Sequence, residues 1–255
     1  MLELQNISYS VTEDGVKTQI LDDVSITIPD NKLTVITGPN GGGKSTLAKV
    51  IAGIIKPDSG RILMDGKDIT DMSITDRANN GIGFAFQQPV RFKGIKVFDL
   101  LRLAQESNKL SSADACKYLA AVGLCAKDYI DREVNASLSG GELKRIEIAT
   151  VLIKKSKLSL FDEPEAGIDL WSFQNLIEVF EGMRKHIEGS SIVIISHQER
   201  ILKIADEILL IKDGKLSARG TADEIMPVLM ASNSFVKNCN VTDIWTGGDK
   251  CDDRA

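Results

Sequence analysis

A glycine-rich stretch near the front of the chain has residues that could bind the phosphates of a nucleotide. It follows the spacing G-x-x-x-x-G-K-[ST] of the phosphate-binding loop. Its glycines allow backbone N–H groups to turn inward around a β-phosphate, which a Cβ would block. Lys44 can reach the β- and γ-phosphate oxygens, and the Ser45 hydroxyl can ligate Mg²⁺. The stretch consists of Gly38, Pro39, Asn40, Gly41, Gly42, Gly43, Lys44, Ser45 and Thr46.

The segments on either side of this loop are predicted to have the secondary structure that a phosphate-binding loop requires, with a strand before it and a helix after it. Leu33–Thr37 is predicted to be a short buried strand, and residues 46–55 a helix. The positive end of that helix would then point at the phosphates. The alternative is a glycine-rich turn that binds nothing. The strand, the loop, the Lys-Ser pair and the helix in register favour phosphate binding.

Two acidic residues follow a second predicted buried strand, at residues 158–161. At the carboxyl end of a parallel strand beside a phosphate loop, Asp162 can hold Mg²⁺, directly or through water. Glu163 can orient or deprotonate the attacking water. The alternative is that the two acids have no catalytic role and lie at the N-terminus of a helix, a position that Asp and Glu favour. With the phosphate loop present, the catalytic interpretation is favoured.

Two further polar residues each follow a predicted core strand. Gln87 comes after the strand at residues 82–86 and could contact Mg²⁺ or the water, so that it senses the γ-phosphate. His197 comes after the strand Ser191–Ile195 and could donate to a γ-phosphate oxygen. A lone histidine is more often structural. The position of His197 at the end of a core strand favours a functional role.

A second glycine-rich helix start lies at residues 138–142, with the sequence LSGGE. Ser139, Gly140 and Gly141 form a second potential anion site. On its own this signal is modest, because Ser-Gly before a helix is also ordinary capping.

The order of the strands and helices that would hold these residues predicts an α/β fold: a phosphate-loop NTPase core with a mainly parallel sheet. Residues 2–30 alternate apolar and polar side chains around a turn at 13–15, which predicts an N-terminal antiparallel β subdomain. Strands and helices then alternate, which is typical of a parallel sheet. Apolar residues at helical spacing predict a small inserted helical subdomain at about 97–138. We expect one domain over residues 1–230 and a weakly ordered C-terminal tail at 231–255.

Composition excludes several classes of protein. The 255 residues carry a net charge of −5, so the chain lacks the excess of basic residues that is typical of nucleic-acid-binding proteins. No apolar run approaches the roughly 20 residues of a membrane span, and the N-terminus lacks signal-peptide features. A cytoplasmic protein without direct membrane insertion is expected. The spacing of Cys116, Cys125, Cys239 and Cys251 matches no zinc template; the first two are expected to pack in helices, and the last two to be surface thiols.

Taken in order, these motifs resemble those of the ATP-binding-cassette (ABC) ATPases, from Tyr9 to about residue 230. The resemblance implies that Tyr9 stacks on adenine and that Asp169 also belongs to the nucleotide site. It further implies that ATP is sandwiched between two copies, with the phosphate loop of one facing Ser139 and Gly141 of the other. One chain then holds half of each site, and a transient ATP-dependent homodimer is expected.

Finer motif details resemble the Suf-type (SufC-like) ATPase of iron–sulfur cluster assembly. The chain reads DEPEAGID at 162–169, SGGELKRIE at 139–147 and SHQERIL at 196–202. Transporter subunits typically have DEPTSALD and SGGQxQR instead. Glu165, Gly167, Lys144 and Glu147 carry the Suf-type resemblance. Pro164, Ala166 and the Asn-rich tail depart from it.

The expected function is therefore that of a Mg²⁺-dependent ATP hydrolase acting on a SufB/SufD-like scaffold protein. Lys44 would stabilise charge, Ser45, Asp162 and Gln87 would contact Mg²⁺, Glu163 would act on water, and His197 would sense the γ-phosphate. The alternative is the ATP-binding subunit of an ABC membrane transporter, with a permease as partner. Its coupling groove would also lie between the Gln87 region and the helical subdomain. A third class, ABC proteins that act on ribosomes or DNA, is disfavoured by the acidic balance.

Overall fold

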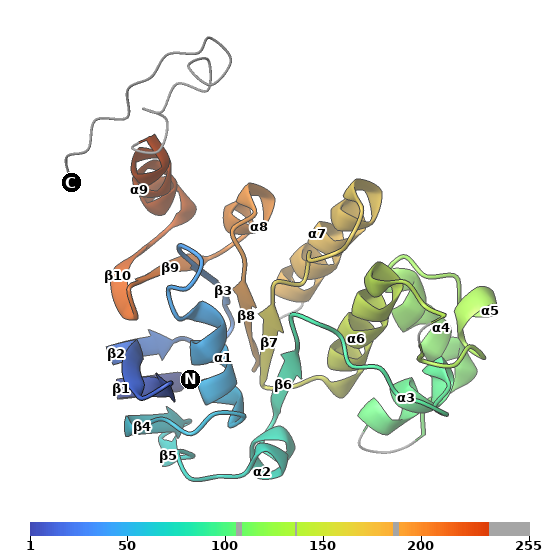
Figure 1. Ribbon diagram of the computed structural model, residues 1–255. Helices are drawn as coiled ribbons and strands as arrows, with labels where there is room; N and C mark the ends of the chain where they lie inside the picture. The colour runs from blue at the N-terminus through green and yellow to red at the C-terminus, as the bar shows by residue number, and fades with distance from the viewer. Residues whose placement is uncertain (106–108, 136, 186–188, 235–255) are drawn as a thin grey trace.

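A computed structural model describes residues 1–105, 109–135, 137–185 and 189–234 of the chain. Strands in these residues form two sheets, and helices lie between and beside them (Figure 1). The predicted α/β class is confirmed. No helix in the part of the chain so described is long and apolar enough to cross a bilayer.

The smaller sheet is antiparallel and has the order β2-β1-β4-β5. Its strands β1 and β2 are joined by the tight turn that the sequence predicts at residues 13–15. The bounds are Leu2–Glu13 for β1, Val16–Ile28 for β2, Ser59–Met64 for β4 and Lys67–Asp68 for β5.

The larger sheet has the order β10-β9-β3-β8-β7-β6, parallel except for β10. Every residue of β3, β7 and β8 is buried, as expected for central strands with both faces covered. Because the strands are parallel, their carboxyl ends share one edge, where the candidate site lies. The bounds are Leu33–Thr37 for β3, Ile82–Ala85 for β6, Leu158–Asp162 for β7, Ser191–Ile195 for β8, Glu207–Lys212 for β9 and Lys215–Gly220 for β10.

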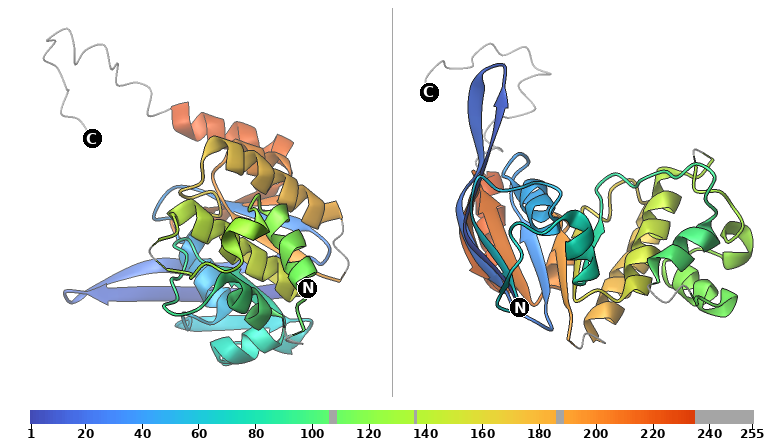
Figure 2. Two further views of the ribbon diagram at one scale, coloured as in Figure 1. Left: turned by 90° about the vertical axis from the view of Figure 1, so that its right-hand side faces the viewer. Right: turned by 90° about the horizontal axis from the view of Figure 1, so that it is seen from below.

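The helices divide the apolar core into two clusters. Helix α1 packs between the two sheets, while α3, α4, α6 and α7 contribute to the cluster on the other face of the larger sheet. Helices α3 to α5 stand with α6 on the side away from the small sheet, as Figure 2 shows. The bounds are Lys44–Ala52 for α1, Ile74–Asn79 for α2, Val97–Ala104 for α3, Ser112–Ala121 for α4, Ala126–Tyr129 for α5, Gly140–Lys154 for α6, Leu170–Lys185 for α7, Glu199–Lys203 for α8 and Ala222–Ser234 for α9.

Several predicted boundaries differ from the structure. Helix α1 begins two residues before the predicted start and stops at Ala52, because Gly53 adopts a left-handed conformation with φ of 79°. Helix α9 crosses the predicted boundary at residue 230. The remainder of the predicted tail, with Cys239 and Cys251, lies outside the described residues.

The prediction that Cys116 and Cys125 pack in helices is wrong. Both side chains are exposed. On α4 the buried positions are Ala115 and Leu119, so Cys116 lies one residue past the buried stripe and faces away from it.

A buried arginine ties α1 to the segment before α2. Arg77 is 1% exposed, and its Nη1 donates to the carbonyls of Val50 and Ile51 at 2.7 and 2.8 Å. Its Nη2 donates to the Thr70 carbonyl at 2.7 Å. Both carbonyls of the first pair belong to the last turn of α1; that of Val50 also accepts from the Gly53 N–H at 3.2 Å, whereas Arg77 is the donor to that of Ile51. Arg77 therefore caps the helix that starts at the phosphate loop.

Arg77→Met is expected to lower the free energy of unfolding by about 2–3 kcal/mol, because it removes three hydrogen bonds made by a buried charged group and leaves the Ile51 carbonyl without this donor. Urea denaturation followed by circular dichroism measures the change. Arg61→Met, at an exposed position on β4, is the matched control. Equal stability of the two variants would contradict the capping role.

Candidate functional site

The phosphate loop is held against β9 and β2 so closely that glycine is required. Gly38 has φ of 140°, and a Cβ built on it would lie 1.9 Å from the carbonyl oxygen of Ile211. Gly43 is the residue before α1, with φ of 99°, and its Cβ would lie 2.7 Å from the Ile20 oxygen. Any larger residue at either position would displace the loop from these strands. The loop thus starts α1 in a defined place, with the free N–H groups of the first turn available for an anion.

Lys44 lies inside this loop rather than extending into solvent. The side chain is buried, and Nζ donates to the carbonyls of Gly38 and Pro39, both at 2.8 Å. Burial lowers the pKa of Lys44, while the nearby carboxylates of Glu163 and Asp162 act in the opposite direction. The ammonium is therefore positioned in the loop by weak neutral acceptors, which phosphate oxygens could replace.

Ser45 and Asp162 meet although 117 positions separate them in the chain. The Ser45 hydroxyl donates to Oδ1 of Asp162 at 3.0 Å. Asp162 is 1% exposed, and its Oδ2 has no hydrogen-bond partner among the residues described. Burial raises the pKa of Asp162, and the neighbouring Glu163 adds to the rise. A buried carboxylate with an unpartnered oxygen beside a hydroxyl fits a hard divalent cation such as Mg²⁺.

Glu163 and Gln87 meet at the same edge of the sheet. Nε2 of Gln87 donates to Oε2 of Glu163 at 2.6 Å. Glu163 has a positive φ of 44°, and its N–H donates to the Ile195 carbonyl at 3.0 Å. Left-handed backbone at a non-glycine residue is uncommon and is found at functional sites more often than elsewhere.

Lys44, Ser45, Gln87 and Glu163 line one cavity together with His197, and Asp162 lies behind Ser45. The cavity has a volume of about 450 Å³ and is lined by Ile20, Asn40, Gly41, Gly43, Lys44, Ser45, Thr46, Gln87, Glu163 and His197. The structure thus brings together a phosphate loop, a carboxylate with one unpartnered oxygen that could hold a cation, and a carboxylate that can act on water. Ile20 on β2 was missed by the sequence analysis, because an apolar residue in an alternating strand gives no signal of a site.

The second glycine-rich segment does not line this cavity within the described chain. Ser139 is the N-cap of α6, and it forms a reciprocal capping box with Glu142, at 3.2 and 2.6 Å. Ser139 and Gly140 are exposed. A Cβ on Gly141 would lie 3.0 Å from the Gly167 carbonyl oxygen, so this helix start packs against the loop after Glu163. One chain therefore presents two separate potential anion sites.

Tyr9 and Asp169 also lie apart from the cavity lining in the described residues. Tyr9 is on β1, opposite Leu21 of β2, and is partly buried against the core cluster that includes α1. Asp169 is exposed, and its Oδ1 accepts from the N–H of Ser172 at 3.0 Å, at the start of α7. Their assignment to the nucleotide rests on the family resemblance.

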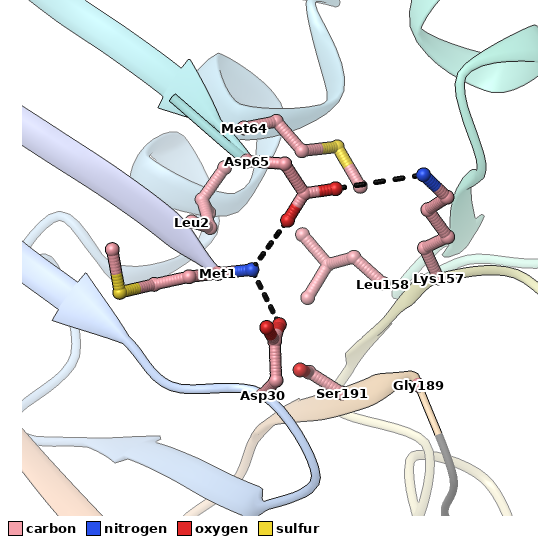
Figure 3. Close-up of a pocket in the computed structure, with 9 residues that line it drawn as sticks. All are labelled: Met1, Leu2, Asp30, Met64, Asp65, Lys157, Leu158, Gly189 and Ser191. Atoms are coloured by element: carbon pink, nitrogen blue, oxygen red, sulfur yellow. Dashed lines mark hydrogen bonds and ion pairs between the residues drawn. The ribbon is translucent and has the colours of Figure 1, made fainter. Parts of the chain in front are cut away.

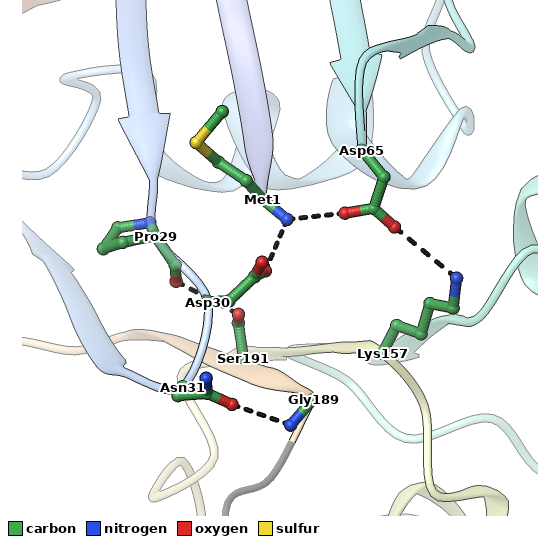
Figure 4. Close-up of polar contacts among 8 residues, drawn as sticks. All are labelled: Met1, Pro29, Asp30, Asn31, Asp65, Lys157, Gly189 and Ser191. Atoms are coloured by element: carbon green, nitrogen blue, oxygen red, sulfur yellow. Dashed lines mark hydrogen bonds and ion pairs between the residues drawn. The ribbon is translucent and has the colours of Figure 1, made fainter.

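A different cavity, of about 210 Å³, lies near the amino ends of β7 and β8, at the opposite edge of the sheet (Figure 3). The Met1 ammonium contacts Asp30 and Asp65, and Lys157 lies 3.5 Å from Asp65 (Figure 4). These charges satisfy one another and join the start of β1 to the larger sheet, so a structural role accounts for them.

Comparison with known proteins agrees with this geometry. The family model described as ABC transporter matches residues 21–166. An uncharacterized ABC transporter ATP-binding protein of Methanocaldococcus jannaschii is 39% identical over 81% of this chain and 85% of its own length. A probable ATP-dependent transporter, ycf16, of Antithamnion sp. is 30% identical over 89% and 93%. A spermidine/putrescine import ATP-binding protein of Mesoplasma florum is 33% identical over 88% of this chain and 63% of its own length.

Solved structures share the fold. One is an ATP-binding cassette in a dimeric post-hydrolysis state bound to ADP and Pi. It has a TM-score of 0.79 and 22% identity, and the match covers 87% of this chain and 99% of that one. The family match and the 39% identical relative together decide the assignment. The chain belongs to the ABC transporter family and is an ATP-binding cassette ATPase.

Proposed function

We propose that this chain is the Mg²⁺-dependent ATP-hydrolysing subunit of an ABC membrane transporter. The observation that carries the catalytic part is the single cavity shared by Lys44, Ser45, Gln87, Glu163 and His197, with Asp162 bonded to Ser45. The partner is inferred from the relatives, which bear the names of transporter ATP-binding proteins. The names favour the transporter alternative over the Suf-type expectation.

Each side chain has a defined task in hydrolysis. Lys44 and the N–H groups of the loop stabilise charge on the β- and γ-phosphate oxygens. Glu163 takes a proton as water attacks the γ-phosphorus and the bond to the β-phosphate oxygen breaks, and Gln87 orients its carboxylate. His197 donates to a γ-phosphate oxygen. Bound Mg²⁺, held by Ser45 and Asp162 with Gln87 beside them, would neutralise phosphate charge.

A second copy of the chain completes the site. Ser139 and Gly141 are presented on an exposed helix start and lie outside the lining of their own chain's cavity. A helix N-terminus approaching from a second copy would place further N–H donors on the γ-phosphate. ATP would then hold two copies together, and hydrolysis would release them.

The transporter's permease is proposed to dock beside Gln87. An apolar groove of about 160 Å³ lies there between β6 and the helices α3 and α6, and its lining includes Phe84, Phe92 and Leu100. Val90 and Phe92 are 46% and 37% exposed, which is high for large apolar side chains. Such a groove suits a short amphipathic helix of a partner.

A Suf-type scaffold partner is the second candidate, and one observation favours it. The residues that carry the Suf-type resemblance are bonded into the site: Glu165 accepts from Ser196, beside His197, and Lys144 contacts the ends of β6 and β7. The exposed groove is equally available to a scaffold protein.

Affinity purification of the tagged full-length chain, in detergent, from its native cells separates the two candidates. A transporter subunit is expected to bring down an integral membrane protein, and Phe92→Asp in the groove should release it. An iron–sulfur scaffold without membrane spans in its place would overturn the transporter proposal. Lys56→Asp, at an exposed surface position, is the control.

A further inference from the structure

A buried ion pair on α6 lies one turn after the exposed helix start. Lys144 is 0% exposed, although lysine is rarely buried, and its Nζ lies 3.4 Å from Oε2 of Glu147. Burial lowers the pKa of Lys144 and raises that of Glu147, and the mutual attraction of the two groups opposes both shifts. Desolvating two charges is costly, so the pair by itself is weak as a stabilising device.

The contacts of the pair lead away from α6 to two strands of the sheet. Nζ of Lys144 donates to the carbonyl of Phe86, and it reaches the carbonyls of Gln87 at 3.5 Å and Asp162 at 3.3 Å. Oε1 of Glu147 accepts from the N–H of Phe86 at 2.9 Å. The two side chains therefore hold both backbone groups of Phe86 and join the ends of β6 and β7.

The ends of β6 and β7 carry groups of the candidate site. Gln87 follows β6 after one intervening residue, Phe86, and its side chain donates to Glu163. Asp162 is the last residue of β7, and its carboxylate accepts from Ser45. Beyond Ala85 and Phe161, β6 and β7 have no paired residues with each other. Lys144 bridges the gap where the sheet's own hydrogen bonds end.

We propose that Lys144 is a positioning residue whose ammonium holds the ends of β6 and β7 at one spacing, so that Gln87 and the Asp162–Ser45 pair keep their places beside the phosphate loop. The proposal rests on the roles proposed above for Gln87, Asp162 and Glu163. Glu147 neutralises the ammonium and holds the Phe86 N–H. The pair links α6, whose first residues serve the second copy, to the catalytic groups of its own chain.

Backbone hydrogen bonds also connect the segment after Gln87 to Val134, which precedes α6 in the chain. The N–H of Phe92 donates to the Val134 carbonyl at 2.8 Å, and the N–H of Val134 donates to the Ile95 carbonyl at 2.8 Å. The segment after Gln87 is thus bonded to the segment that leads to Ser139. Both connections therefore join α6 and the residues before it to the segment that carries Gln87.

Two double variants that differ only in hydrogen-bond donors test the proposal. Lys144→Met with Glu147→Gln removes both charges, keeps an acceptor for Phe86 and leaves the carbonyls without a donor. Lys144→Gln with Glu147→Gln has the same charge but restores an N–H donor. We expect the Met variant to lose about tenfold or more in kcat, and the Gln variant to recover most of it. The dissociation constant of a non-hydrolysable ATP analogue should change less than twofold in either, since the phosphate loop is untouched.

The controls separate positioning from folding. Neutralising an exposed pair, with Lys56→Met and Asp71→Asn, should leave kcat unchanged. Equal kcat in the Met and Gln variants, at equal thermal unfolding midpoints, would overturn the donor role. Should the Met variant not fold, the Gln variant alone decides. It keeps a donor for the carbonyls without leaving an unpaired buried charge, so kcat near wild type supports the proposal, and a tenfold loss at an unchanged unfolding midpoint overturns it.

The rate of ATP hydrolysis by Glu163→Gln tests the proposed catalytic roles separately from the role of Lys144. If Glu163→Gln hydrolyses ATP at the wild-type rate, the proposed function of the cavity is wrong. If Glu163→Gln is inactive while the Met variant keeps the wild-type kcat, only the positioning role of Lys144 is wrong.

Discussion

Replacing Glu163 by Gln is expected to slow ATP hydrolysis by at least about a hundredfold while ATP still binds, because a general base contributes about 10²- to 10⁴-fold. Glu163 lines the phosphate cavity, and its carboxylate is held by Gln87 at 2.6 Å. A glutamine can keep that hydrogen bond through its amide oxygen, so the geometry is retained. It cannot accept the proton of the attacking water.

The same variant is expected to accumulate as an ATP-bound dimer. If ATP holds two copies together and hydrolysis separates them, blocking hydrolysis leaves them paired. Gel filtration with ATP and Mg²⁺ should show twice the monomer mass, and the mass should fall when nucleotide is removed. Glu178→Gln, at an exposed position on α7, should behave as wild type. A monomer in saturating ATP would contradict the two-copy site for this chain on its own.

Lys44→Ala is expected to weaken ATP binding by about a hundredfold, close to the upper range for hydrogen bonds to a charged group. The ammonium is already inside the loop, bonded to Gly38 and Pro39, so it loses little freedom on contacting phosphate oxygens. Alanine removes the charge and leaves these two carbonyls facing the phosphates, which repel them. Titration calorimetry with a non-hydrolysable ATP analogue measures the loss.

The control for Lys44 is a lysine of equal charge beyond the other end of α1. Lys56 is exposed and pairs with Asp71 at 2.7 Å, so Lys56→Ala should leave the affinity unchanged. An affinity of Lys44→Ala within a few fold of wild type would show that the loop N–H groups suffice and that Lys44 has another task.

The predictable part of the fold is the part with strong local signals. Leu33–Thr37 was predicted with its observed bounds, because an apolar run before a glycine-rich loop leaves few alternatives. The turn at 13–15 was likewise found from its Asp-Gly pair. The end of α1 was misplaced, because Ile54 and Ile55 continue the apolar spacing while Gly53 already terminates the helix. Helix α9 was missed although Thr221 and Glu224 have the spacing of a capping box, because Pro227 inside the helix is typical of a helix end.

The candidate site likewise has residues that the sequence predicts and contacts that it does not. Gln87, Asp162, Glu163 and His197 each follow a buried strand, and parallel strands bring such residues to one edge. Ile20 and the carbonyl contacts of Lys144 have no local signature. The backbone groups that Lys144 binds belong to β6 and β7, and any residue type would present the same carbonyls.

The sequence by itself determined the pattern of a phosphate-binding loop at 38–46 and the resemblance to the ABC ATPases, because those motifs lie within short continuous segments. Only the tertiary structure decided which distant groups meet: Ser45 with Asp162, Gln87 with Glu163, and Lys144 with the ends of two strands. It also placed the helix start at Ser139 outside the cavity of its own chain. The physical reason is that hydrogen bonds and burial depend on distance in space, which the order of residues along the chain does not contain.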